Sequence, residues 1–340
     1  MNGGAPSAAP RVLDVEHRTR YAYSSPVSAS HHVAHLQPLS DAHQQLRAWT
    51  LQIEPGPAHS RASRDGFGNA QHHFELHATH TRLEVCARSR VAMWPRHAGL
   101  KPEDSPAWDS LAARLRYVAG GAFEPALEFA LPSPYVPRLP ALAGFAAPSF
   151  LPGRPVAAVA LDLMHRIHAE FAYEARSTDV DTPLARVLAQ RRGVCQDFAH
   201  IMITVCRSWG IPARYVSGYL FTDREGGDRS DPDASHAWLE VFLPSIRWIG
   251  FDPTNNILAG ERHVSAAIGR DYADIPPSRG VYKGEAESQL AVGVNVRRAR
   301  PTAGEPEFMR LASPSFARGG GRRRPGSGAF LLERQQQQQQ

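Results

Sequence analysis

The chain has 340 residues, of which 42% are hydrophobic and 21% charged, enough for two globular domains with cores of their own. No apolar run approaches the roughly 20 residues of a membrane-spanning helix, and the first ten residues lack the charged start and apolar stretch of a signal peptide. We therefore expect a cytoplasmic protein with no membrane partner.

Positive charge is unevenly distributed along the chain. The formal net charge is +5, but residues 301–340 contain six arginines and only three glutamates. The rest of the chain is nearly neutral, so we expect no nucleic-acid partner. Because residues 301–340 are rich in Gly, Arg and Pro, this basic tail is predicted to be disordered.

The first structured region is predicted at residues 11–95. Short runs of alternating apolar and polar residues recur there between Pro, Gly and Asn, and RDGFGN at 64–69 is a turn signal. This spacing predicts an all-β, sandwich-like domain. His73, Glu75 and His77 would share one strand face, which we interpret as an exposed polar face rather than a metal site.

Helices are predicted after a proline-rich connecting region at residues 96–150. From about residue 155, apolar residues fall on one helical stripe: Val156, Val159, Leu163 and Ile167. The segment TPLARVLAQRRG at 182–193 predicts a short helix with Thr182 as its N-cap and Pro183 at the first helical position.

Three cysteines, Cys86, Cys195 and Cys206, are too few and too scattered for a disulfide framework, so we expect free thiols. The apolar positions after Cys195 have helical spacing and stop at Gly210, so this cysteine is predicted to begin a helix that ends near residue 209. Cys206 would lie ~16 Å along the same helix, too far for a disulfide. Cys86 and Cys206 are most simply core residues.

Cys195 has two interpretations. A lone cysteine is more often a core residue than a nucleophile. At the start of a helix, however, the free backbone N–H groups and the helix dipole favour the thiolate, and the same N–H groups can stabilise an oxyanion. Catalysis would require a base from elsewhere in the chain.

The candidate base lies in a predicted hairpin made by SHAWLEVF (235–242) and RWIGFDPTN (247–255). With an odd-numbered loop such as residues 244–246, His236 and Asp252 would share a face as diagonal neighbours, about 7–8 Å apart at Cα. The aspartate could then orient an imidazole that activates the thiol. An even-numbered loop would put the two residues on opposite faces, and each alone could be an ordinary strand histidine or Asx turn.

These segments resemble the bacterial transglutaminase-like family. GVCQDFAH, GIPARYVSGY, SHAW and DPTN follow the family's order, and the resemblance covers about residues 11–297. It implies an α+β fold: an N-terminal β domain, then a papain-like core with a cysteine-bearing helix packed on an antiparallel sheet. It also implies that Cys195 is the nucleophile, that His236 is the general base and acid, and that Asp252 orients His236.

The chemistry implied by the resemblance is attack of the Cys195 thiolate on a peptide or protein amide, which forms a thioester that passes to water or to an amine. No metal or other cofactor is expected. The sequence leaves open hydrolysis or transfer, and the alternatives are a crosslinking transglutaminase proper or a non-catalytic binding module with this fold. It also leaves the substrate and the oligomeric state open.

Four further features surround these residues. Gln190 is a candidate oxyanion donor, and Trp238 either walls the site or packs in the core. Asp197 is expected to stabilise the start of the helix, and the polar residues 222–234 are expected to form a flexible flap rather than a calcium loop.

The predicted organisation has four parts. The β domain covers residues 11–95, the connecting region 96–150, the catalytic core 151–297 and the disordered tail 301–340.

Overall fold

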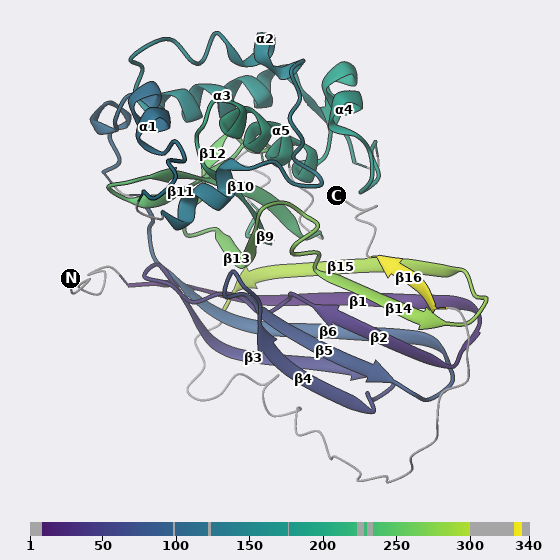
Figure 1. Ribbon diagram of the computed structural model, residues 1–340. Coiled ribbons are helices and arrows are strands. Elements are labelled where there is room, and N and C mark those ends of the chain that lie inside the picture. Colours follow the sequence, from purple (N-terminus) through teal and green to yellow (C-terminus); the bar gives the residue numbers. More distant parts are fainter. Residues whose placement is uncertain are drawn as a thin grey trace. The chain divides into compact units, whose positions relative to one another are not determined.

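The computed structural model describes residues 9–97, 99–121, 124–175, 177–222, 228–229, 234–299 and 330–334 (Figure 1). The described residues form two compact units, one made of those in 10–93, 276–299 and 330–334 and the other mainly of those in 94–275. Each unit has its own hydrophobic core. In the described part of the chain, no helix combines the length and the apolar character needed to cross a membrane.

The first unit consists of two antiparallel sheets. In spatial order, one sheet contains β15 (Ser288–Arg298), β1 (Arg11–Val27), β6 (His80–Met93) and β3 (Gln44–Glu54). The other contains β16 (Phe330–Arg334), β14 (Ser278–Lys283), β2 (Ala29–Ala34), β5 (Ala70–Leu76) and β4 (His59–Arg64). Side chains from both sheets share one core, which is the arrangement of a sandwich.

The boundary of the second unit differs from the sequence-based expectation. The expected core spans 151–297 and includes residues 276–297. In the structure, β14 pairs with β2 and β15 pairs with β1, so these residues complete the first unit instead. The alternation in LAVGVNV predicts a strand without saying which sheet it joins. The proline-rich residues 96–150 belong to the second unit, where Leu111, Val136 and Phe145 enter its core.

The tail was expected to be disordered throughout. Residues 330–334 instead form β16, which pairs antiparallel with β14. This corrects the expectation for that short segment. Residues 300–329 and 335–340 lie outside the described residues.

The second unit is built on a five-stranded antiparallel sheet. Its spatial order is β12 (Ile257–Leu258), β11 (Arg247–Asp252), β10 (His236–Leu243), β9 (Ala213–Leu220) and β13 (His263–Gly269). Its helices are α1 (Trp108–Arg114), α2 (Leu142–Ala146), α3 (Val156–Glu170), α4 (Leu184–Gln190) and α5 (Cys195–Ser208). Two 3-10 turns (Pro102–Asp104 and Pro125–Ala130) and the short parallel pair β7 (Ala172–Tyr173) and β8 (Arg192–Gly193) complete it.

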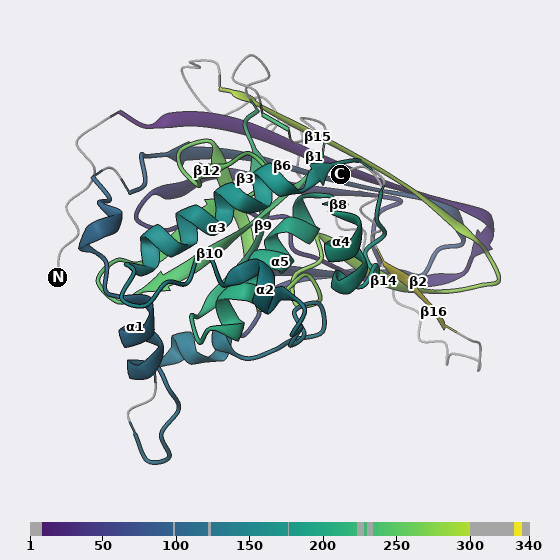
Figure 2. The same cartoon turned by 90° about the horizontal axis from the view of Figure 1, so that it is seen from above.

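The helices that position the site follow the predicted periodicity. α3 contacts α5, and the two helices lie beside each other in Figure 2. The four stripe residues of α3 are all buried, which confirms that prediction. α5 packs on one face of the sheet, where Ala237, Leu239 and Val241 share its core.

The predicted ends of α4 and α5 agree with the structure to different degrees. α5 ends just before Gly210, whose φ of 76° suits glycine. α4 begins at Leu184, with Pro183 rather than Thr182 as its N-cap. The Thr182 hydroxyl instead accepts a hydrogen bond from the Asp179 N–H.

Candidate active site

Cys195 is the first residue of α5, and its side chain is buried. The chain enters the helix through the extended residue Val194, whose N–H donates a 2.9 Å hydrogen bond to Asp197 Oδ2. The Thr178 hydroxyl donates to the same oxygen at 2.6 Å. Asp197 therefore secures the start of α5, as predicted, and burial raises its pKa to about 6.

Gly193 makes this helix start possible. A Cβ atom at this position would lie 2.6 Å from Asp197 Oδ2, so any larger residue would push the carboxylate away from the Val194 N–H. Position 193 therefore requires glycine, because the Asp197 side chain folds back against it and leaves no room for a Cβ atom.

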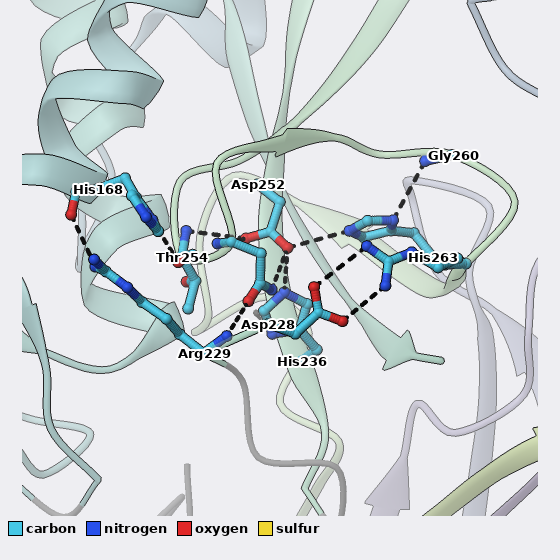
Figure 3. Close-up of polar contacts among 10 residues, drawn as sticks. His168, Asp228, Arg229, His236, Asp252, Thr254, Gly260 and His263 are labelled. Carbon is cyan, nitrogen blue, oxygen red and sulfur yellow. Dashed lines mark hydrogen bonds and ion pairs between the residues drawn. The ribbon is translucent and has the colours of Figure 1, made fainter. Parts of the chain in front are cut away.

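The β10–β11 hairpin has the register that brings His236 and Asp252 together. Leu239 faces Phe251 and Glu240 faces Gly250, as expected for an odd-numbered loop. His236 Nε2 and Asp252 Oδ2 are 2.8 Å apart, and both side chains are buried (Figure 3). The predicted odd-numbered loop and the shared face of His236 and Asp252 are confirmed.

His236 also hydrogen-bonds the side chain of Cys195. Burial by itself would lower the pKa of His236, but the charge of Asp252 and the hydrogen bonds to Asp252 and Cys195 raise it above its ordinary value. Because Nε2 faces Asp252, Nδ1 is the ring nitrogen left for the thiol. A cysteine at a helix start, an imidazole and a buried carboxylate thus form one chain of contacts.

The Asp252 carboxylate is held by the turn that follows it. Oδ1 accepts hydrogen bonds from the backbone N–H groups of Thr254 (3.0 Å) and Asn255 (3.2 Å), and Oδ2 accepts one from Asn255 Nδ2 at 2.8 Å. Burial would raise the pKa of this carboxyl, but the charge of His236 and the hydrogen bonds from His236 and His263 lower it. Asp252 therefore forms an Asx-type turn and also contacts His236, so the two interpretations of this residue hold together.

Sequence reasoning missed His263. Its Nε2 lies 3.2 Å from Asp252 Oδ2, and its side chain is buried. In the sheet, β9 and β10 lie between β13, which carries His263, and β11, which carries Asp252. No local pattern in the sequence could indicate this contact.

Trp238 packs against both histidines. Its ring stacks on His236 (centroids 5.9 Å apart) and meets His263 edge-on at 5.1 Å. Trp238 is also buried beside Val216 and Ala259, so it is both a core residue and a neighbour of the candidate site.

Gln190 and Gln196 differ in their relation to Cys195. Gln190 ends α4 with an exposed side chain, and no hydrogen bond in the described part of the chain joins it to Cys195, His236 or Asp252. Gln196, the residue after Cys195, is 3% exposed and its buried Oε1 has no hydrogen-bond partner there. The buried amide adjacent to the cysteine is therefore that of Gln196, which sequence reasoning did not single out.

The other two cysteines are buried free thiols, as predicted. Burial raises the pKa of Cys206 to about 12 and also raises that of Cys86. Both therefore stay protonated at neutral pH, which makes them internal references for the reactivity of Cys195.

One set of potential metal ligands exists among the described residues: His236, Asp252 and His263, whose ligand atoms lie within 4.8 Å of one another. The contacts of 2.8 and 3.2 Å onto one carboxylate oxygen are ordinary hydrogen bonds. We therefore interpret the three side chains as a hydrogen-bonded group.

Part of the expected flap is tied to the same turn. The Arg229 N–H donates to Asn255 Oδ1 at 2.7 Å, and its guanidinium donates to the His168 carbonyl at 2.8 Å (Figure 3). Asp228 forms an ion pair with Arg262 at 2.7 Å. Residues 223–227 and 230–233 of the expected flap lie outside the described residues.

Comparison with known proteins identifies the family of this chain. Residues 13–92 match the bacterial transglutaminase-like N-terminal region, and residues 151–253 match the transglutaminase-like superfamily. An uncharacterized protein of Mycobacterium tuberculosis is 40% identical over 289 residues, which cover 83% of this chain and 91% of the relative. The chain belongs to the bacterial transglutaminase-like family.

Two further similarities concern the fold and the kind of chemistry. A crystal structure named "Putative Cysteine Protease" from Cytophaga hutchinsonii has the same fold, with a TM-score of 0.66, 22% identity and coverage of 87% of this chain and 93% of that one. A protein-glutamine gamma-glutamyltransferase of Pseudomonas aeruginosa is 32% identical over 146 residues, 38% of this chain and 21% of that protein. The first similarity shows the fold, and the second, together with the family, supports a cysteine-dependent enzyme in general.

Proposed function

We propose that this protein is a cysteine-dependent enzyme that acts on amide bonds of peptides or proteins. The observation that carries the proposal is the position of His236, which hydrogen-bonds Cys195 on one side and the buried Asp252 on the other. This arrangement suits a thiolate–imidazolium pair whose positive member is stabilised by a carboxylate.

The reaction would follow from these groups. The Cys195 thiolate attacks the carbonyl carbon, and the backbone N–H groups at the start of α5 stabilise the oxyanion. The His236 imidazolium gives its proton to the departing amine, which leaves a thioester on Cys195. His236 then takes a proton from the incoming water or amine, which attacks the thioester carbonyl. The C–S bond breaks, a carboxylic acid or a new amide leaves, and the thiolate–imidazolium pair is restored.

Hydrolysis and acyl transfer are both compatible with these residues. Similarity to the Pseudomonas aeruginosa protein-glutamine gamma-glutamyltransferase favours transfer from a glutamine side chain as the second candidate. The cytoplasmic location and the absence of nucleic-acid and membrane partners stay predictions.

The test combines thiol reactivity with acceptor choice. Cys195 should react with iodoacetamide much faster than Cys86 and Cys206 at neutral pH, as measured by mass spectrometry, and His236→Ala should remove this difference. Glutamine-containing peptides are then offered in oxygen-18 water with and without a labelled primary amine. Heavy oxygen in the product indicates hydrolysis, and label in the product indicates transfer.

The matched control is Cys206→Ser, which changes a buried thiol outside the site and should retain activity, whereas Cys195→Ser should lose it. Equal labelling rates for the three cysteines, or full activity in Cys195→Ser, would refute the proposal. A binding module with this fold would then be the better explanation.

A further inference from the structure

His263 has a partner on each ring nitrogen. The Gly260 backbone N–H donates to Nδ1 at 3.3 Å, and Nε2 lies 3.2 Å from Asp252 Oδ2 (Figure 3). A backbone N–H can only donate, so Nδ1 accepts and the single proton of the neutral ring lies on Nε2. His263 is thus arranged as a neutral donor to the carboxylate.

The charges around His263 favour this neutral form. Burial is the largest influence and lowers its pKa, and the nearby charges of His236 and Arg262 act in the same direction. Asp252 opposes them, while Asp228 is engaged by Arg262 at 2.7 Å. Asp252 Oδ2 therefore faces two histidines of different kinds, one with a raised pKa and one with a lowered pKa.

We propose that His263 is a positioning residue which, as a neutral hydrogen-bond donor, stabilises the ionised form of Asp252 and thereby sets the pH range in which Cys195 and His236 are reactive. The inference rests on the proposed function, because it assigns a role within that site. The hydrogen bonds of the described His263 side chain run to Asp252 and Gly260, so His263 acts on Cys195 through Asp252 and His236.

Removal of this donor has a defined consequence. Without the His263 hydrogen bond, the buried negative charge of Asp252 is less well stabilised, so protons bind more tightly to the whole group of Asp252, His236 and Cys195. Both limbs of the pH profile of Cys195 reactivity then move to higher pH, by about one unit. A side chain that only filled space would change the rate without moving the limbs.

The experiment measures the rate of iodoacetamide labelling of Cys195 in the full chain from pH 4 to 10. His263→Leu should move both limbs upward, and His263→Gln, whose amide N–H can replace Nε2, should restore them to the wild-type values. The matched control is His200→Leu. His200 is also buried and accepts a hydrogen bond from the Tyr272 backbone N–H, but its contacts among the described residues include no carboxylate. This variant should leave both limbs in place.

A measurement on the wild-type protein covers the case in which His263→Leu does not fold. Nitrogen-15 NMR of His263 should show a neutral ring protonated at Nε2 throughout the active pH range. A charged ring, a proton on Nδ1, or unshifted limbs in folded His263→Leu would overturn the inference. If wild-type Cys195 reacts no faster than Cys86 and Cys206, the proposed function fails instead, so the two failures are distinguishable.

Discussion

Asp252 is a fully buried carboxylate with five hydrogen-bond donors directed at its two oxygens. They are His236 Nε2, His263 Nε2, Asn255 Nδ2 and the N–H groups of Thr254 and Asn255. An isolated buried charge is costly, but a carboxylate with this many donors remains ionised. At the residue scale, the candidate site depends on keeping one negative charge in an apolar interior.

Asp252→Asn should lower the rate of Cys195 alkylation at neutral pH by about 100-fold or more. Asp252 raises the pKa of His236, and the imidazolium exists below that pKa and is lost as the pH rises through it. Removal of the charge lowers this pKa, so the alkaline limb should move to lower pH. The rate is measured by mass spectrometry across the pH range.

The control for this variant is Asp274→Asn, which removes a carboxylate that pairs with Arg270 at 2.8 Å in the same unit. It should leave the alkaline limb unchanged. An alkaline limb that stays in place in Asp252→Asn would contradict the assigned electrostatic role.

At the scale of elements, the start of α5 packs tightly against the residues of β8 that precede it in the chain. β8 brings Gly193 against the Asp197 carboxylate, which in turn holds the Val194 N–H. The position of Cys195 therefore depends on atoms that lie on both sides of it in the sequence.

Gly193→Ala should destabilise the protein by about 1–3 kcal/mol, because the new methyl group would overlap Asp197 Oδ2. Cys195 alkylation should slow as the helix start shifts. Chemical denaturation measures the first effect and mass spectrometry the second. Gly144→Ala is the control: its site in α2 has open space, so stability should be unchanged or slightly increased, and equal effects of both variants would refute the account.

At the scale of the whole molecule, the described residues from 10 to 299 pass from one unit to the other and back again. The chain leaves the first unit after Met93, forms the second through Ile275, and returns to place β14 beside β2 and β15 beside β1. The returning strands cover edges that would otherwise expose unpaired backbone groups. The first unit is therefore incomplete without residues from the far end of the sequence.

A chain truncated after Ile275 should aggregate or lose amide protection in β1 and β2, because both strands lose a neighbour. Hydrogen exchange followed by mass spectrometry measures the protection, and size-exclusion chromatography detects aggregation. A chain ending at residue 299 keeps β14 and β15 and should stay soluble with both strands protected. Equal protection in the two chains would contradict the edge-covering role.

Much of the candidate site was predictable because its signals are local. The apolar spacing after Cys195 and the stop at Gly210 define α5, and the length of the loop after β10 sets which residues share a face. The errors have a common origin. Gln190 is near Cys195 in sequence, but its side chain is exposed at the end of α4. The sequence of a strand such as β15 does not indicate which sheet the strand joins.

The sequence by itself determined the β-rich first part and the helix that begins at Cys195, because periodicity and helix ends are properties of neighbouring residues. It left the pairing of His236 with Asp252 to the parity of one loop, which the β10–β11 register shows to be odd. Only the tertiary structure decided that His263 donates to Asp252, and that β14 and β15 complete the first unit. These contacts join segments distant along the chain. Their energy comes from burial and hydrogen bonds that form only when the sheets assemble, so they leave no local pattern to read.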